Sequence, residues 1–234
     1  RRQEFELDAT RPELEYGRAQ YDQTHVFNLN GIYELPFGKG KRFLSSGSGV
    51  LDHLFGGWQF NGIVRIASGS PFGIFDPRGT LNYNTQSARN PANTNLTKAQ
   101  IRNLVGIFKT DKGIFFINPK VIDPVTGRAA NGYGQPTFAG QVFFNVDPGQ
   151  IGNGERFFLN GPLYFNVDAS LFKNIRISEK MRFQIRAEAF NLLNRTNFAL
   201  TGAQQLQNVN ASTFGRLGVD FAPRVIQFAG RFEF

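Results

Sequence analysis

The sequence ends on RVIQFAGRFEF, residues 224–234, a stretch that alternates between two chemistries. In an extended strand, successive side chains point to opposite faces. One face then carries Ile226, Phe228, Gly230, Phe232 and Phe234, and the other carries Val225, Gln227, Ala229, Arg231 and Glu233. A soluble sandwich strand can alternate in this way, but it rarely ends a chain with three phenylalanines on one face. The pattern is typical of an outer-membrane barrel strand, with lipid on one side and water on the other.

The same alternation recurs in four earlier segments, so that strands are predicted near residues 24–35, 57–67, 163–177, 181–190 and 223–234. Each run has about 9 to 15 residues and, with a tilt of about 40°, covers an apolar band of about 25 Å. Strands of soluble proteins are usually only about 5 or 6 residues long. The sequence therefore predicts an all-β fold, an antiparallel meander that forms part of a transmembrane outer-membrane β-barrel with long extracellular loops. Lys173 is the exception on an otherwise apolar face.

Composition narrows the class of protein further. Only 41% of the 234 residues are apolar, and Gly and Phe each occur 26 times. No apolar run approaches the roughly 18 residues of a transmembrane helix, so membrane contact would be made by strands. The chain has no cysteine and two histidines, which leaves little room for metal chemistry. The net charge of +8 is spread along the chain without a basic run, which argues against a nucleic-acid partner.

The connections between the predicted strands are either short or long. Ser178–Lys180 form a tight turn that places Ile177 opposite Met181 and Ile175 opposite Phe183. Residues 36–57 form a medium connection rich in Gly, Lys and Ser, with an apolar patch at Val50–Phe55. The long connections, 69–161 and 191–222, are predicted to be outer loops, since such barrels have short periplasmic turns and long extracellular loops. Counting back from a final strand that ends at the periplasm puts every long connection outside.

Local structure is also predicted inside the first long loop. Thr97 and Gln100 form a capping-box pattern, and Ile101, Leu104, Val105 and Phe108 follow at helical spacing, which predicts a short helix. Further strands are predicted around residues 113–117 and 141–146.

Several segments resemble, in order and spacing, the C-terminal end of TonB-dependent outer-membrane receptors, especially those with an N-terminal carboxypeptidase-regulatory-like domain. The resemblance extends over roughly residues 16–234. Its matching segments are Tyr33–Phe43, Gly56–Gln59 with Ser68–Phe72, Gly161–Pro162 followed by Asn166–Asn174, Ala187–Asn194 with Thr196–Phe198, and Pro223–Phe234.

The resemblance implies a large plugged barrel of the 22-strand type that imports ligands with energy passed through TonB. Five or six strands cannot close a barrel, so we expect this chain to be the C-terminal segment of such a receptor; a remnant that needs partners is the alternative. The implied partners are the lipid bilayer, lipopolysaccharide, the barrel-assembly machinery and, through an N-terminal region absent here, the TonB complex. The full-length protein is expected to be a monomeric barrel in the bacterial outer membrane. Its assembly signal would be Phe228, Phe232 and Phe234.

Polar and charged residues gather on the water-facing side of the predicted strands. The candidate lumen-facing residues are Gln59, Arg65, Asp168, Arg182, Arg186, Glu188, Arg231 and Glu233. They would form a polar wall against which a plug docks and past which ligand moves. The alternative is a structural charge ladder in which Arg182 pairs with Glu233; exposed pairs of this kind contribute about 0.2 to 1 kcal/mol each.

Other functions find less support in the sequence. Gly38-Lys39-Gly40-Lys41-Arg42 lacks the spacing of a phosphate-binding loop, and no acid, base and nucleophile combination is apparent. We therefore expect no enzyme, no cofactor and no metal site. A structural or adhesive surface barrel without active uptake and a soluble β-sandwich binding module remain as alternatives. Siderophores, oligosaccharides and peptides all suit the architecture as ligands, because fold does not fix substrate.

Deletion of Phe234 is expected to reduce membrane insertion of the full-length protein, because the terminal aromatic is the implied assembly signal. Insertion is measured as the fraction of protein with heat-modifiable migration in outer-membrane preparations. Unchanged insertion would count against this role.

Overall fold

The structure is a computed structural model that describes residues 7–8, 10–15, 17–45, 49–81, 90–132, 134–198, 200, 204–218 and 222–234. Parts of both predicted long loops, including residues 82–89 and 219–221, lie outside this set. The chain divides into two compact units. The sheet unit comprises His25–Ala67, Tyr164–Asn197 and Phe221–Phe234, and the loop unit comprises Arg1–Thr24, Ser68–Leu163 and Phe198–Asp220.

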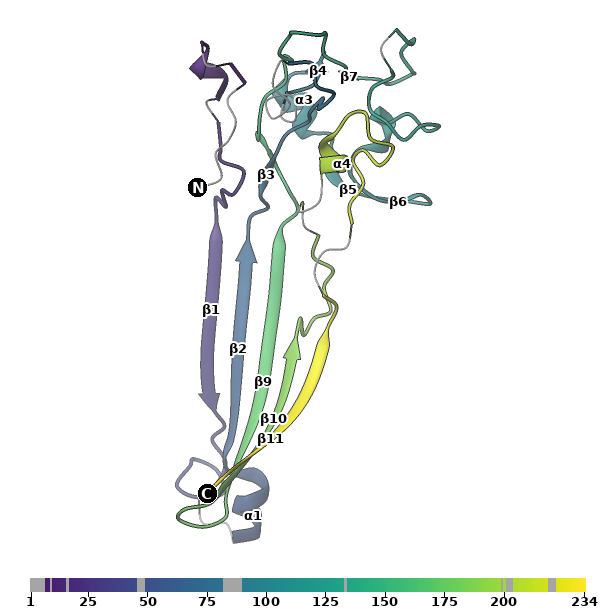
Figure 1. The fold of residues 1–234 in the computed structure, drawn as a ribbon. Helices are drawn as coiled ribbons and strands as arrows, with labels where there is room; N and C mark the ends of the chain where they lie inside the picture. The colour runs from purple at the N-terminus through teal and green to yellow at the C-terminus, as the bar shows by residue number, and fades with distance from the viewer. Residues whose placement is uncertain are drawn as a thin grey trace. The chain divides into compact units, whose positions relative to one another are not determined.

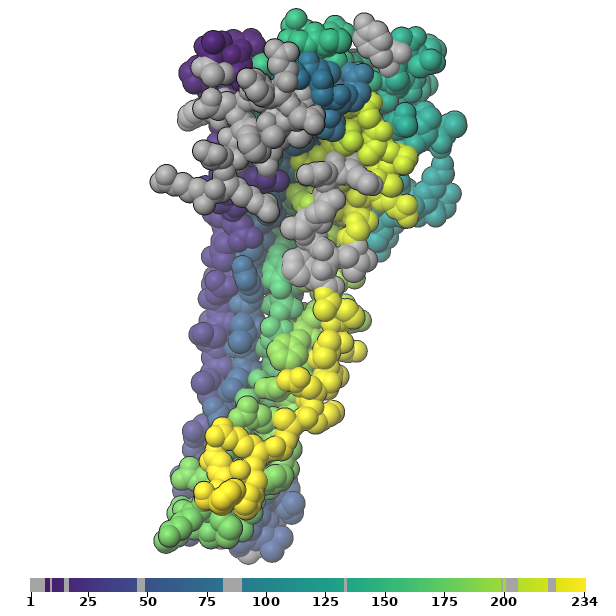
Figure 2. All heavy atoms as spheres, in the orientation of Figure 1, coloured from purple at the N-terminus to yellow at the C-terminus, as the bar shows by residue number. Residues whose placement is uncertain are grey.

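The sheet unit is built on five long strands. They are β1 (Val26–Glu34), β2 (Trp58–Ala67), β9 (Tyr164–Arg176), β10 (Arg182–Phe190) and β11 (Val225–Glu233). Their order is β1-β2-β9-β10-β11, and every neighbouring pair is antiparallel (Figure 1). The predicted antiparallel meander is therefore confirmed. The five strands thus form one sheet, and β1, β2 and β9 are seen side by side in the space-filling view (Figure 2).

The strand register puts most of the large apolar side chains of the five strands on one side of the sheet. Val64 of β2 lies opposite Leu29 of β1 and Val167 of β9, and Phe183 of β10 lies opposite Ile175 and Phe232. The predicted hairpin is confirmed: the Ile177 amide donates to the Met181 carbonyl at 3.0 Å. The side of the sheet that includes Val64 is called the apolar face, and the side that includes Arg65 is called the polar face.

Three asparagines at the start of the β10–β11 connection hold strand ends together. The Asn191 amide donates to Oδ1 of Asp168 at 2.8 Å. The side chain of Asn197 accepts from the Phe165 amide at 3.0 Å and donates to its carbonyl at 2.9 Å, and Asn194 Oδ1 accepts from the Arg224 amide at 3.1 Å. Asn191 and Asn194 adopt φ values of 50° and 49°, a region that asparagine tolerates better than most residues. These bonds tie β9, β10 and the start of β11 together at one end.

The connection between β1 and β2 contains helix α1 (Gly49–Phe55). A tight approach at its end holds this connection to β9: the Asn174 amide donates to the Gly57 carbonyl at 2.9 Å. Gly57 has φ of +71°, and a Cβ atom there would lie 2.3 Å from the Asn174 carbonyl oxygen. Only glycine fits this position without displacement of the backbone.

The loop unit consists of short elements. They are η1 (Pro12–Glu15), β3 (Pro71–Phe72), β4 (Asn93–Thr94), α3 (Lys98–Arg102), β5 (Val105–Thr110), β6 (Gly113–Ile117), η2 (Pro119–Val121), β7 (Phe143–Phe144), β8 (Leu159–Asn160) and α4 (Gln204–Gln207). Three two-stranded sheets pair β3 with β8, β4 with β7 and β5 with β6. The described parts of the two long connections thus hold regular structure.

The two long connections fold together around a hydrophobic core of their own, which no pattern in the sequence predicts. Phe72 and Phe143 from the first connection and Phe214 from the second are fully buried, and the Phe143 and Phe214 rings lie 6.0 Å apart. Backbone bonds join the same segments: the Phe75 amide donates to the Gln207 carbonyl at 2.8 Å, and the Val209 amide donates back to Phe75 at 3.0 Å. The long connections are therefore one folded unit.

The predicted loop helix is present but shorter than its sequence pattern indicates. α3 has Thr97 as its N-cap and the predicted capping box with Gln100, and it ends at Arg102. The prediction was wrong for Val105 and Phe108, which belong to β5. The cause is the turn that follows: Gly113 adopts φ of +124°, and Thr110 Oγ1 donates to its carbonyl at 2.9 Å, so β5 pairs with β6 as a hairpin. The predicted strand at 141–146 is the two-residue β7.

Two carboxylates in the loop unit brace turns and remain ionised at neutral pH. Hydrogen bonds from the Thr10 hydroxyl and the Arg11 guanidinium lower the pKa of Asp8 to about 2. The Thr126 hydroxyl and the Val125 amide lower the pKa of Asp123. A lowered pKa means that each carboxylate stabilises its turn above the ordinary carboxyl pKa and loses that contribution as the pH falls through the lowered value.

Asp76 is the buried polar centre of the loop unit, with no exposed surface. Its carboxylate pairs with the Arg78 guanidinium at 2.8 Å, and it accepts from the Val146 amide at 2.8 Å and from Asn210 Nδ2 at 3.0 Å. Val146 and Asn210 belong to different regions of the unit. One carboxylate therefore links three separate stretches of chain.

Asp76→Ala is expected to destabilise the loop unit by about 3 to 5 kcal/mol, since it leaves buried donors and a cation without their partner. The measurement is urea-dependent protease cleavage within residues 68–163 of the detergent-solubilised full-length protein. Asp111→Ala, in the exposed β5–β6 turn, is the matched control and is expected to behave as wild type. Equal protease resistance of the two variants would contradict this assignment.

Candidate functional site

The polar face of the sheet collects almost all the charge of the five strands. Nine of their ten charged residues lie on it, and Lys173 alone lies on the apolar face. All eight candidate residues from the sequence are on this face: Gln59, Arg65, Asp168, Arg182, Arg186, Glu188, Arg231 and Glu233. Their shared face follows from the period-2 alternation of each strand.

Side chains on the polar face of β9, β10 and β11 contact one another, both across strands and along β10. Gln184 Nε2 donates to Asn174 Oδ1 at 2.7 Å, and Arg186 Nε donates to Gln184 Oε1 at 2.5 Å. The Arg186 guanidinium also lies 5.2 Å from the centre of the Phe172 ring. Gln227 Nε2 of β11 donates to Glu188 Oε2 at 2.5 Å. These contacts form two groups on the polar face, one that joins β9 to β10 and one that joins β10 to β11.

The ion pair predicted between Arg182 and Glu233, near the turn at residues 177–181, does not form. The register does place Arg182 opposite Glu233, but Glu233 pairs with Arg231 on its own strand, at 3.0 Å. Arg182 lies opposite Arg176 on its other side, so two like charges are adjacent there. The charge ladder proposed as an alternative does not form across β10 and β11 at this position.

Large apolar side chains on the other face are exposed. They include Phe27, Leu29, Tyr33, Phe60, Ile185, Ile226, Phe228, Phe232 and Phe234. Phe228 and Phe234 are 78% and 96% exposed, and the Phe232 and Phe234 rings stack with centroids 6.0 Å apart. A contiguous apolar surface of this kind in a soluble protein would promote aggregation, so it calls for a non-aqueous environment.

A comparison with protein-family models matches residues 3–227 to an outer membrane β-barrel domain. The chain belongs to this family. Its location is therefore the bacterial outer membrane, and its sheet is part of a barrel wall with the apolar face toward lipid. A search of curated proteins and a search of solved structures found no match.

Membership of this family bears on the two edge strands of the sheet, β1 and β11. β1 and β11 each have only one hydrogen-bonded neighbour among the described strands. Backbone groups within a bilayer need partners, because no water is present there to replace them. In the complete barrel wall both strands therefore pair with further strands.

Lys173 forms a second polar contact site, whose partners the sequence did not reveal. It is 4% exposed, and its Nζ donates to the carbonyls of Leu54, at 3.2 Å, and Gly56. It also lies 5.3 Å from the Trp58 ring. The sequence marked Lys173 only as an exception, because its partners lie more than 110 residues away.

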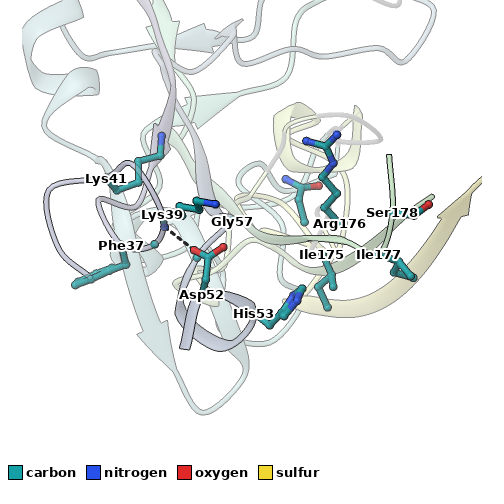
Figure 3. Close-up of a pocket in the computed structure, with 13 residues that line it drawn as sticks. Phe37, Lys39, Lys41, Asp52, His53, Gly57, Ile175, Arg176, Ile177 and Ser178 are labelled. Atoms are coloured by element: carbon teal, nitrogen blue, oxygen red, sulfur yellow. Dashed lines mark hydrogen bonds between the residues drawn. The ribbon is translucent and has the colours of Figure 1, made fainter. Parts of the chain in front are cut away.

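Beside this contact, α1 and the β1–β2 connection border a hollow of about 510 Å³. Asp52 and His53 of α1 line it, together with Ile175 and Ser178 from the β9–β10 hairpin (Figure 3). Asp52 accepts from the Lys39 amide at 2.5 Å. Among the described residues, no group of three or more His, Asp or Glu side chains could hold a metal ion, and none of the helices described is long and apolar enough to cross a membrane.

Val64→Arg is expected to destabilise the folded protein in a bilayer by about 2 to 4 kcal/mol, because it places a charge on the lipid-facing side. Ile63→Arg is the matched control: the adjacent residue lies on the polar face opposite Asp168, and its substitution is expected to cost much less. Both are measured by urea titration of the full-length protein folded into phosphatidylcholine vesicles. Equal losses for the two variants would contradict the assignment of the faces.

Proposed function

We propose that this chain forms the barrel wall and outer loops of a TonB-dependent receptor that imports a ligand across the outer membrane. The observation that carries the proposal is the folded loop unit. Segments 68–163 and 198–220 share a buried core, so they can hold a binding surface in a fixed shape. A rigid scaffold that presents loops is the common arrangement of a recognition site.

The topology supports a division of labour between the strand ends. The loop-unit segments all connect to the same end of the strands: they precede β1, join β2 to β9, and join β10 to β11. The opposite strand ends are joined only by the connection that contains α1 and by the turn at residues 177–181. In the proposal, the strand ends that carry the loop unit face outside, near lipopolysaccharide, where ligand is captured. The ends joined by α1 and the 177–181 turn face the periplasm.

The polar face supplies the second element of the proposal. A wall that presents arginine, glutamate and amide side chains toward the barrel interior suits a docked plug and the passage of a polar ligand. The interior contacts among Asn174, Gln184 and Arg186 hold these side chains in place. Energy would come from the TonB complex, and Phe228, Phe232 and Phe234 would be recognised by the barrel-assembly machinery. The proposal includes no enzymatic activity and no cofactor.

Import is tested by growth of the native bacterium with a ferric siderophore mixture, maltodextrins or casein peptides as the limiting nutrient. Deletion of the gene is expected to impair growth on one of these nutrients, and deletion of TonB is expected to impair growth on the same one. Complementation with Asp111→Ala should restore growth, whereas Asp76→Ala should fail to do so although the barrel still assembles. Heat-modifiable migration checks assembly.

Two outcomes would overturn the proposal. Growth on all three nutrients without the gene, together with reduced attachment of cells to surfaces, would favour a structural or adhesive barrel. Impaired growth that does not depend on TonB would favour passive passage through the barrel.

A further inference from the structure

Helix α1 has one apolar side that is exposed, and the residues that the structure describes do not cover it. Val50, Leu51, Leu54 and Phe55 are 70%, 39%, 60% and 50% exposed. At 100° per residue they occupy an arc of about 140° around the helix axis. Asp52 and His53 occupy the remaining side and line the hollow of Figure 3. The helix is therefore amphipathic, with its polar side toward the protein.

Two side chains fix the C-terminal end of α1 on the lipid-facing side of the sheet. Trp58 Nε1 donates to the Leu54 carbonyl at 3.0 Å, and Lys173 Nζ donates to the same carbonyl. Trp58 and Lys173 lie opposite each other on the apolar face. A cation at the C-terminus of a helix is favoured by the partial negative charge of its free carbonyls. The single charge on the apolar face thus serves to hold α1 there.

The segment before α1 has the composition of a membrane–water interface. Phe37, Phe43 and Leu44 are exposed, and the two phenylalanine rings lie 5.6 Å apart. Lys39, Lys41 and Arg42 are interspersed among them, and the Arg42 guanidinium lies 5.6 Å from the centre of the Phe43 ring. Aromatic rings with basic side chains between them are enriched where acyl chains meet anionic headgroups.

We propose that α1 and residues 37–44 form an interfacial anchor that lies in the periplasmic leaflet of the outer membrane. Val50, Leu51, Leu54 and Phe55 enter the acyl-chain boundary, and Lys39 and Arg42 contact phospholipid headgroups. Lipid is the occupant because the uncovered side continues the lipid-facing surface of the sheet through Trp58, and because the flanking charges are basic. The anchor is independent of ligand import.

The absence of cysteine from the sequence allows single labels to test this anchor. Leu54→Cys on the apolar side of α1 and His53→Cys on its polar side, about 100° apart around the helix axis, each receive a bimane fluorophore in the full-length protein, provided that any cysteine elsewhere is replaced. The protein is folded into vesicles of phosphatidylcholine and phosphatidylglycerol, with brominated acyl chains as the lipid quencher and iodide as the aqueous quencher. Leu29→Cys on β1 reports lipid contact of the barrel itself.

The label at Leu54 is expected to be quenched several-fold more by brominated lipid than the label at His53, with the reverse order for iodide. Added Lys173→Met is expected to remove this difference, since it deletes the contact with the helix while leaving an apolar side chain toward lipid. Unchanged quenching in this variant would overturn the role of Lys173.

Equal aqueous quenching at Leu54 and His53 would overturn the anchor, and so would protection of Leu54 from both quenchers, which would indicate a protein cover. The Leu29 label separates these results from failure of the barrel: lipid quenching at Leu29 without quenching at Leu54 rejects the anchor alone. Growth on the limiting nutrient tests import separately.

Discussion

The register of the five-stranded sheet is the constraint on which the rest of the structure depends. Because the side chains alternate with a period of two, a shift of one residue in any pairing would turn that strand's apolar side chains toward water and its charges toward lipid. The pairing of Val64 with Leu29 and Val167, and of Phe183 with Ile175 and Phe232, keeps one continuous apolar face. Within a bilayer the same ladder also satisfies the backbone.

Contacts at both ends of the strands hold this register. Asn191, Asn194 and Asn197 join β9, β10 and the start of β11 through side-chain and backbone bonds. At the other end of the strands, Gly57 allows a close approach of the backbone to Asn174, and Lys173 and Trp58 bind the C-terminal end of α1. Each of these residues acts on a strand end, where slippage would begin. These contacts give a physical reason for residues in several of the segments that carry the family resemblance.

Sequence reasoning succeeded where the signal was local and periodic. Alternation alone predicted the long strands, the in-phase hairpin at Ile177 and Met181, and the shared face of the eight polar candidates. It failed where distant residues decide the structure. The core around Phe72, Phe143 and Phe214 has no period to detect, and the partner of Glu233 depends on side-chain geometry that the register does not determine. Val105 and Phe108 matched a helical spacing by coincidence, since a glycine turn made them part of a hairpin.

The separation of a lipid-facing side from a water-facing side is the central claim, and the accessibility of spin labels along β9 tests it most directly. Single nitroxide labels are placed at each position from Tyr164 to Arg176 of the full-length protein in phospholipid vesicles, and their collision rates with oxygen and with a water-soluble nickel chelate are measured. The account predicts a period of two, with oxygen favoured at positions such as Val167 and Leu171 and nickel favoured at Asp168 and Ser170. A profile without this alternation would contradict it.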